Sequence, residues 1–446
     1  MSRGSNWQTR ILVLVAGLTA LSIGAPEAAP RIGGTDAQAQ SVFRDARGYT
    51  VRIRTRIEAP FGADKLGSFF GAGFLVDAER RWLLTNAHVV GESPSEVEVA
   101  FADGEFQPAK KIYVDSFTDV AVLQVEHIPT GRRPAILETR DEVAVGETVG
   151  AFGHPLGMHF TGTRGIVSNV TDQAGPDLLQ IDATVDHGNS GGPVISLRSG
   201  RVIGIATAGF DTDKSDRMNF ATPLKDVLRI IKLLKAGESP VPTLFEFTLL
   251  RNDQGSHTME VGATSDPVRW PLQSGDRIES VEGVGEVQTY SKLVTALRGC
   301  RGSARLSVLR NGKSIALQIA PAMAEPVLER RGLGMDGALI SSFLWDDGAV
   351  FVERQPLRVE FVMPGSAAEA QGLSPGDRIE SIDGVGYASL EALRSALHAR
   401  PEGKVARIVL RRWSPSDNRI FDFHVRELPM EEIVEVGPQA EEVAAR

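Results

Sequence analysis

The sequence predicts a mainly β N-terminal domain followed by two copies of a small α+β module. Residues 50–222 contain many short apolar and β-branched runs separated by Gly, Pro, Asn and Asp, a pattern typical of β-barrels and sandwiches. Beyond residue 243, one motif occurs twice at an offset of 101 residues. Because 446 residues exceed what one hydrophobic core supports, we expect three globular units.

Composition excludes several classes of protein. Hydrophobic residues make up 42% and charged residues 24% of the chain, and the mean hydropathy of -0.08 excludes a multi-spanning membrane protein. The net charge of -9 and the absence of a concentrated basic face argue against nucleic-acid binding. No G-x-x-x-x-G-K-[ST] phosphate loop occurs. We expect protein and peptide partners, and no cofactor.

The N-terminus is typical of a secretory signal. Arg3 and Arg10 precede an apolar stretch at residues 11–24, which is short for a membrane span. We expect residues 1–29 to be a signal peptide cleaved near residues 25–30; the alternative is retention as an N-terminal anchor that tethers the protein to the membrane. Cys300 is the one cysteine of the chain, so no intrachain disulfide forms. Export to a bacterial cell envelope, the periplasm, fits both features.

Each unit has recognisable elements. Residues 224–235 follow Pro223 with apolar positions on one helical face, which predicts a closing helix before a stiff linker at 237–243. In the repeat, residues 272–285 and 373–386 are identical at ten of fourteen positions. We expect a helix and then a strand after each copy, at 291–298 and 304–309, and at 390–398 and 405–410. The acidic tail, residues 429–446, is expected to be disordered. The strands expected in the first domain include residues 71–76, 81–85, 97–101, 120–125 and 201–206.

Three residues form a candidate catalytic set. Ser190 lies in the string Gly-Asn-Ser-Gly-Gly-Pro at 188–193, and a serine nucleophile needs such an exposed tight turn with nearby backbone N–H donors. His88 directly follows a predicted apolar strand, and Asp119 directly precedes another. Histidine, aspartate and serine are the residue types of a serine protease triad.

The order and contexts of His88, Asp119 and Ser190 resemble the trypsin-like fold, and more closely the HtrA/Deg (Do-like) proteases. The strings at residues 71–77, 152–157, 165–168 and 219–223 also resemble that family. The resemblance implies a chymotrypsin-like double β-barrel protease domain at residues 40–236. It also implies an ATP-independent serine endopeptidase that cleaves unfolded, damaged or signal-bearing proteins in quality control of the cell envelope, and a trimer.

The triad chemistry assigns the roles. Ser190 would attack the scissile carbonyl, His88 would transfer its proton, and Asp119 would orient the imidazole. Backbone N–H groups of Gly188, Asn189 and Ser190 would form the oxyanion hole. Asn189 in place of an aspartate argues against zymogen activation, so we expect activity to depend on the order of the loops at 153–162 and 209–217.

The primary specificity pocket lacks an acidic residue. Thr184 lies six residues before the serine, where this fold usually forms the base of the pocket, so cleavage after Arg or Lys is not expected. We expect small or medium apolar side chains to fit. The expected pocket residues are Thr184, Ile205, Ala206, Thr207 and Phe220.

Other polar residues are weaker candidates. Asp115 fits a surface turn better than the triad, and His187 fits a solvated loop. His154, His159 and His187 lack the spacing of zinc ligands, so no metal site is expected.

The second module, residues 328–428, resembles a PDZ domain through the string at 362–373. PDZ domains bind peptide C-termini by strand addition, with a loop holding the terminal carboxylate. The resemblance implies that loop at Gly332, Leu333, Gly334 and Met335, with Leu393 and Leu397 as pocket residues on the facing helix. Packing in the core is the alternative for both leucines.

The first module, residues 244–322, diverges. We expect it to be a divergent PDZ-like domain. No glycine-containing carboxylate loop is evident near residues 244–250, so it either binds peptides poorly or serves mainly as a structural or regulatory spacer. Two alternatives to a quality-control protease remain for the whole chain: a PDZ scaffold or holdase chaperone with vestigial protease activity, and a dedicated processing protease in envelope stress signalling.

Overall fold

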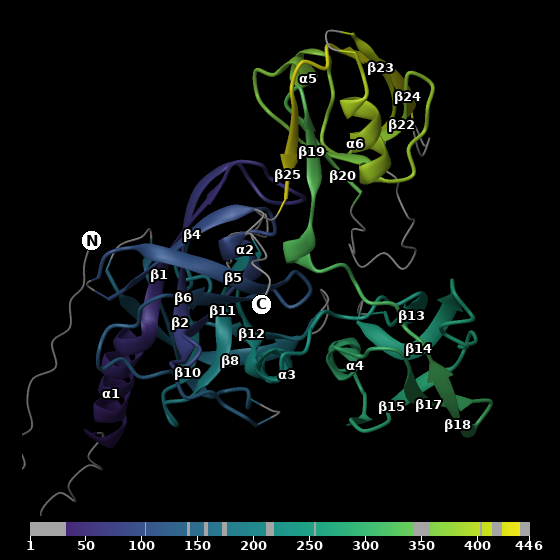
Figure 1. Ribbon diagram of the computed structural model, residues 1–446. Coiled ribbons are helices and arrows are strands. Elements are labelled where there is room, and N and C mark those ends of the chain that lie inside the picture. The colour runs from purple at the N-terminus through teal and green to yellow at the C-terminus, as the bar shows by residue number, and fades with distance from the viewer. Residues whose placement is uncertain are drawn as a thin grey trace, which may run out of the picture.

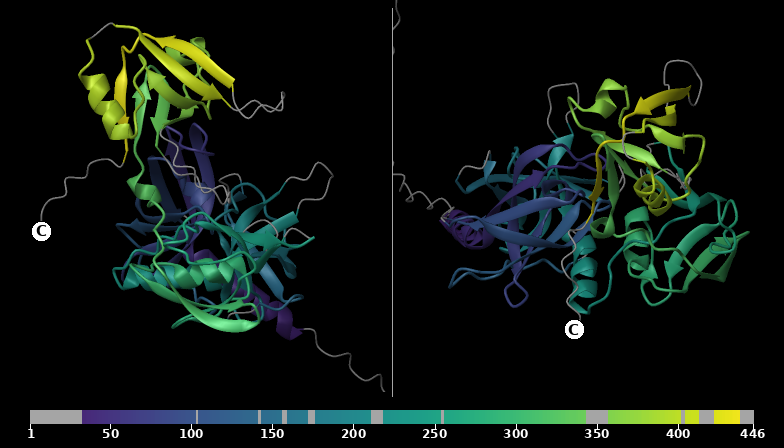
Figure 2. Two further views of the ribbon diagram at one scale, coloured as in Figure 1. Left: turned by 90° about the vertical axis from the view of Figure 1, so that its right-hand side faces the viewer. Right: turned by 45° about the horizontal axis from the view of Figure 1, so that its top comes forward.

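The structure, a computed structural model, describes residues 33–102, 104–140, 143–155, 159–171, 176–210, 218–253, 256–342, 357–401, 404–412 and 422–437. The predicted signal peptide lies outside these residues. The chain forms a pair of barrels and two smaller modules (Figure 1). The second module stands above the barrels and the first module, both in Figure 1 and in the left view of Figure 2.

Two closed six-stranded barrels form the N-terminal domain, which confirms the chymotrypsin-like fold. Each barrel closes because its end strands pair with each other, β1 with β4 and β10 with β7, so no sheet edge is left free. The first has the order β1-β2-β3-β6-β5-β4 and the second β10-β11-β12-β9-β8-β7. The strands are β1 Thr50–Ile57, β2 Gly67–Asp77, β3 Trp82–Thr85, β4 Ser95–Phe101, β5 Gln107–Asp115, β6 Val120–Val125, β7 Thr148–Gly153, β8 Thr161–Thr171, β9 Leu178–Ile181, β10 Pro193–Ser196, β11 Val202–Phe210 and β12 Met218–Pro223.

Of the three helices of this domain in the described residues, only the last was predicted from the sequence. α3 (Leu224–Lys235) has the predicted bounds, and it buries Val227 and Ile230 completely; such burial contributes roughly 1.5–3 kcal/mol for each side chain. α1 (Gly33–Tyr49) was not predicted. It packs on the barrels through its C-terminal half, where the Phe43 ring meets Phe152 edge-on with centroids 4.7 Å apart. A four-residue helix, α2 (Ala87–Val90), follows β3.

The two modules share a strand order and an ion pair. In the first, Arg310 donates to both oxygens of Asp276 at 2.7 and 2.6 Å. In the second, Arg412 does the same to Asp377 at 2.6 and 2.7 Å. Each repeated aspartate therefore anchors its own sheet. The first module contains β13 Phe247–Arg251, β14 His257–Thr264, β15 Arg277–Val281, β16 Gly285–Glu286, α4 Tyr290–Leu297, β17 Ala304–Arg310 and β18 Lys313–Ile319.

The second module has additional strands. The order β13-β14-β15-β17-β18 corresponds to β20-β21-β22-β23-β24, and β19 and β25 extend the second sheet beyond it. Residues 429–446 were expected to be disordered, but Ile433–Val436 form β25, because the free edge of β19 offers them hydrogen-bonding partners. The elements are η2 Val327–Glu329, β19 Gly332–Met335, β20 Ala338–Ser341, β21 Arg358–Val362, α5 Ala367–Ala370, β22 Arg378–Ile382, α6 Leu390–His398, β23 Ala406–Arg412, β24 Asp422–Leu428 and β25 Ile433–Val436.

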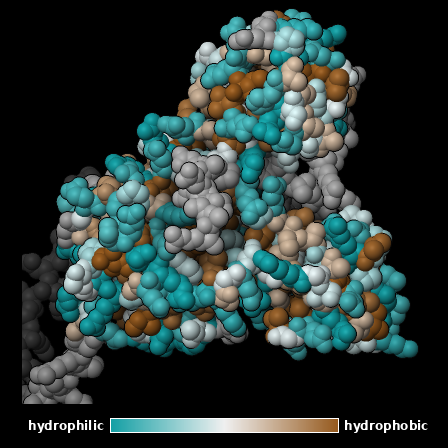
Figure 3. Space-filling model, viewed as in Figure 1, coloured by the Kyte–Doolittle hydropathy of each residue, from teal (hydrophilic) through white to brown (hydrophobic). Residues whose placement is uncertain are grey.

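The surface is mixed in polarity. Hydrophobic patches are small and lie scattered among hydrophilic side chains on the face drawn in Figure 3. No helix in the described part of the chain is both long and apolar enough to span a membrane.

Candidate active site

His88 and Asp119 are held together in the first barrel. The Nδ1 atom of His88 lies 2.8 Å from Oδ2 and 3.0 Å from Oδ1 of Asp119. The backbone N–H of His88 also donates to Oδ1, at 3.0 Å. Asp119 directly precedes β6 and has a positive φ of 52°, a conformation that aspartate tolerates better than most residues. Asn86 fixes it by donating to its carbonyl oxygen at 2.8 Å.

Thr207 joins this pair from the second barrel. Its hydroxyl donates to Oδ2 of Asp119 at 3.0 Å. The sequence predicted Thr207 as a residue of the specificity pocket; the contact of its hydroxyl with the Asp119 carboxylate was not predicted. The sequence contains one signal for this contact, a hydroxyl residue on β11, the second strand after the serine turn.

The Ser190 turn lies at the junction of the barrels. The Ser190 carbonyl accepts from Ala72 N in the first barrel, and Gly191 N donates to Ala206 O in the second, both at 2.8 Å. Gly191 has φ 86°, and a Cβ atom there would lie 2.2 Å from the Ala72 oxygen, so only glycine fits. Among the described residues no hydrogen bond joins the Ser190 hydroxyl to His88; in unliganded enzymes such bonds often tighten only with substrate.

One of the three predicted oxyanion-hole donors is already used within the turn. The N–H of Asn189 donates to Asp186 O at 2.9 Å, so it is already used, which corrects that expectation. Gly188 and Ser190 remain the candidate donors. Gly188 has a positive φ of 101°, and its carbonyl accepts from His154 N at 3.1 Å.

The charges around His88 favour its protonated form. Desolvation by the surrounding protein lowers the pKa of His88, but the charge of Asp119, its hydrogen bond and the charge of Asp64 outweigh this and raise the pKa above its ordinary value. A carboxylate beside the ring is what a general base needs to stabilise the imidazolium it becomes.

Two families match the sequence. The trypsin-like peptidase domain matches residues 71–205, which include the three candidate residues, and the PDZ domain matches residues 325–411. The probable periplasmic serine endoprotease DegP-like of Rhizobium meliloti is 31% identical over 367 residues, covering 75% of this chain and 71% of that protein. The chain belongs to the HtrA/Deg family of serine proteases.

Further relatives agree with this assignment. The periplasmic pH-dependent serine endoprotease DegQ of Escherichia coli is 27% identical over 361 residues, covering 74% of this chain and 76% of DegQ. A solved HtrA-type protease, AlgW with tripeptide, is 25% identical with a TM-score of 0.52, covering 65% of this chain and 98% of AlgW. This HtrA protein is therefore a serine peptidase with a trypsin-like domain and a PDZ domain, acting on protein or peptide substrates. The scaffold alternative is not favoured.

The other predicted pocket residues separate into two groups. Thr184 is exposed, and its carbonyl accepts from the Thr163 hydroxyl at 2.8 Å. Ile205 and Ala206 are fully buried in hydrophobic cores, and Phe220 is also buried. The side chains of Ile205 and Ala206 therefore do not line a surface pocket. Loop residues 156–158 and 211–217, expected to control activity, lie outside the described residues.

Asp115 is not the surface residue that the sequence predicted. Its carboxylate is fully buried and lies 2.5 Å from Nη1 of Arg298, also fully buried, in the first module. The turn is buried because Arg298, 183 positions later in the chain, pairs with Asp115 and covers it. His187 is exposed, as predicted. In the parts of the chain that the structure describes, no group of three His, Cys, Asp or Glu side chains could hold a metal ion.

The predicted carboxylate loop of the PDZ domain is part of a strand. Gly332–Met335 form β19, which pairs with β20 on one side and β25 on the other. Leu393 and Leu397 are buried in the core of this domain, at 0% and 4% exposure. This burial agrees with the alternative that both leucines pack in the core. Gly332 leaves space for the protease domain, since a Cβ there would lie 2.9 Å from the Phe61 ring.

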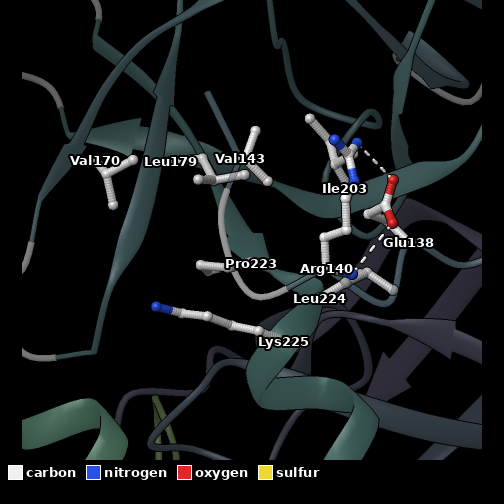
Figure 4. A pocket seen from close by; sticks show the side chains of 9 residues that line it. All are labelled: Glu138, Arg140, Val143, Val170, Leu179, Ile203, Pro223, Leu224 and Lys225. Atoms are coloured by element: carbon white, nitrogen blue, oxygen red, sulfur yellow. Dashed lines mark hydrogen bonds and ion pairs between the residues drawn. The ribbon is translucent and has the colours of Figure 1, made fainter. Parts of the chain in front are cut away.

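A separate cavity of about 270 Å³ opens at the second barrel (Figure 4). His88, Asp119 and Ser190 are not among its lining residues, so it is not the active site. Its lining is Glu138, Arg140, Val143, Val170, Leu179, Ile203, Pro223, Leu224 and Lys225.

Proposed function

We propose that His88, Asp119 and Ser190 are the catalytic triad of this HtrA-type protease. The observation that supports this most is the hydrogen-bonded array of Thr207, Asp119 and His88. The residue before Thr207, Ala206, accepts a backbone hydrogen bond from Gly191 of the Ser190 turn. A carboxylate bound on both sides in this way can hold one tautomer of the imidazole with Nδ1 protonated.

The mechanism follows from these positions. Ser190 Oγ attacks the scissile carbonyl while Nε2 of His88 takes its proton, and the N–H groups of Gly188 and Ser190 stabilise the oxyanion. His88 then protonates the leaving amine, and an acyl-enzyme remains on Ser190. Water activated by His88 releases the acyl group. No nucleotide enters this sequence of steps.

We propose unfolded, damaged or signal-bearing envelope proteins as substrates. The relatives named as periplasmic endoproteases support this location and class. Thr184 carries no charge that would bind a basic side chain, so small or medium apolar residues are expected before the cleaved bond. The PDZ domain would bind peptide C-termini. The AlgW structure was solved with a tripeptide, which supports a peptide ligand for this protein. A homotrimer is expected, and static light scattering would test it.

The test is mass spectrometry of peptides released from an unfolded protein such as reduced casein. The wild-type chain should release peptides that end in small or medium apolar residues, and Ser190→Ala should release none. Dominant cleavage after Arg or Lys would refute the pocket assignment. Undiminished cleavage by Ser190→Ala would refute the triad.

A further inference from the structure

The edge of β19 is occupied by the chain's own C-terminal segment. β25 runs antiparallel to β19, with Gly332 opposite Val436 and Met335 opposite Ile433. The strand lies alongside β19 in Figure 1. An extended segment that adds to a free sheet edge is the mode by which PDZ domains bind peptides.

The side chains of β25 make the contacts of a bound peptide. Ile433 packs against the hydrophobic core of the PDZ domain. Glu435 accepts from Nη1 of Arg394 on α6 at 2.9 Å. These two residues point to the same face, because alternate side chains of a strand do so. The segment therefore lies in the groove between β19 and α6.

The direction of the segment also fits. Its C-terminal end, Val436, lies opposite Gly332 at the start of β19, and Gly437 lies beside Arg331. A peptide ending at the position of Val436 would bring its carboxylate to the stretch before β19, where the exposed Arg331 is a complementary charge.

We propose that residues 433–436 are a displaceable resident ligand of the PDZ groove. External peptides would compete for the same site if their last four residues follow the pattern of Ile433 to Val436. That pattern is an apolar residue, any residue, an acidic residue and an apolar residue. This inference rests on the proposed peptide binding by the PDZ domain.

Contacts at both ends hold the segment in place. Asp336 accepts from the backbone N–H groups of Met430, Glu431 and Glu432, at 2.5, 2.9 and 2.8 Å. At the other end, Val436 packs beside the cluster of Phe61 and Leu339, which joins the PDZ domain to the protease domain.

Tethering weakens external binding without any new contact. A segment joined to its site by a short linker competes at an effective concentration of about millimolar. The apparent dissociation constant of an external peptide equals its intrinsic dissociation constant divided by the fraction of grooves that the segment leaves unoccupied. Removing the tail should restore the intrinsic affinity.

The experiment measures binding of the fluorescein-labelled peptide Glu-Glu-Ile-Val-Glu-Val, with a free carboxylate, by fluorescence anisotropy. The full chain is compared with a chain ending at Met430, whose folding is checked by circular dichroism. We expect the shortened chain to bind at least about tenfold more tightly. The same peptide with Lys in place of its second-last Glu is the control, and it should bind Arg394→Glu better than the wild-type groove.

The full-length Glu435→Arg variant provides a second test that does not depend on truncation. Its new side chain faces Arg394, so the segment should leave the groove, peptide affinity should rise about tenfold, and the amides of Gly332–Met335 should exchange faster. Equal peptide affinity of the wild type and both variants would overturn the resident-ligand inference and leave peptide binding by the PDZ domain intact. Absence of binding in all three chains would overturn both.

Discussion

The Thr207 hydroxyl on β11 donates to Oδ2 of Asp119 at 3.0 Å, while Nδ1 of His88 lies 2.8 Å from the same oxygen. The Asp119 carboxylate, directly before β6, is thus bound from both barrels at once. Relative displacement of the barrels would break one of these contacts, so the geometry of the site depends on the packing between them.

Replacement of Thr207 by valine should lower activity without unfolding the protein. The change removes a hydrogen bond to a charged group, worth roughly 1.5–3 kcal/mol, so kcat/KM should fall about tenfold to a hundredfold. Thr207→Ser keeps the hydroxyl and should stay near wild type. Steady-state cleavage of a fluorogenic peptide measures both variants. Equal activity of Thr207→Val and wild type would show that the contact does not orient Asp119.

The pKa of His88 predicts the acidic limb of the pH profile. Because Asp119 and Asp64 raise this pKa against desolvation, kcat/KM should rise with pH with a midpoint above 6.5, as neutral imidazole is the base. Asp64→Asn removes one negative charge and should lower the midpoint; Glu58→Gln, an exposed control, should not. The raised pKa also means that protonated His88 stabilises the fold below pH 6.5, a contribution lost as pH rises through the raised value. A wild-type midpoint below 6.5 would contradict this.

Asp226 should make the contact between α3 and α4 depend on pH. Its carboxylate is buried and accepts from the hydroxyls of Ser291 and Thr295 at 3.2 and 3.1 Å. Burial, opposed by the Lys225 charge, raises its pKa to about 6. The folded state therefore binds this proton more tightly than the unfolded state. The free energy of unfolding falls as pH rises from about 4 to 6, and it keeps the lower value above pH 6. Two pKa units correspond to roughly 3 kcal/mol.

Hydrogen exchange of α4 tests this. At pH 8, Asp226→Asn should protect these amides more than wild type, because no buried charge forms. At pH 4.5 the two should be nearly equal. The exposed Asp253→Asn is the matched control. Equal protection of Asp226→Asn and wild type at pH 8 would refute the prediction.

Arg298 should stabilise the turn that leads to Asp119. It pairs with Asp115 in a fully buried contact, and Asp115 accepts from the N–H groups of Phe117 and Thr118 at 3.0 and 3.3 Å. Arg298→Met leaves a buried carboxylate unpaired, which costs about 3–5 kcal/mol. The midpoint temperature of thermal unfolding should decrease, and the rate of peptide cleavage should fall.

The neighbouring exposed Arg301→Met serves as the control and should leave both quantities unchanged. Adding Asp115→Asn to Arg298→Met removes the orphan charge and should recover part of the stability. Full stability of Arg298→Met alone would mean that the ion pair adds nothing to the interface.

Local patterns in the sequence predicted much of the fold. The bounds of α3 and α6 agree with the predicted 224–235 and 390–398, because apolar spacing and capping residues are local signals. The strands flanking His88 and Asp119 were predicted for the same reason. α1 was missed because its 17 residues are mostly polar and begin at two glycines.

Contacts between distant parts of the chain could not be predicted. The burial of Asp115 depends on Arg298, and the strand β25 depends on β19, about a hundred residues earlier. The acidic composition of the tail indicates disorder only as long as no sheet edge is available to it. The hydrogen bond of Thr207 likewise depends on how the two barrels pack.

The most direct test of the central claim is labelling by a fluorophosphonate, which reacts with an activated serine, followed by peptide mapping. The proposed triad predicts a single adduct on Ser190 in the wild-type chain, and its loss in His88→Ala, because the neutral hydroxyl is a weak nucleophile without its base. An adduct on another serine, or equal labelling of Ser190 in His88→Ala, would contradict the assignment of this triad.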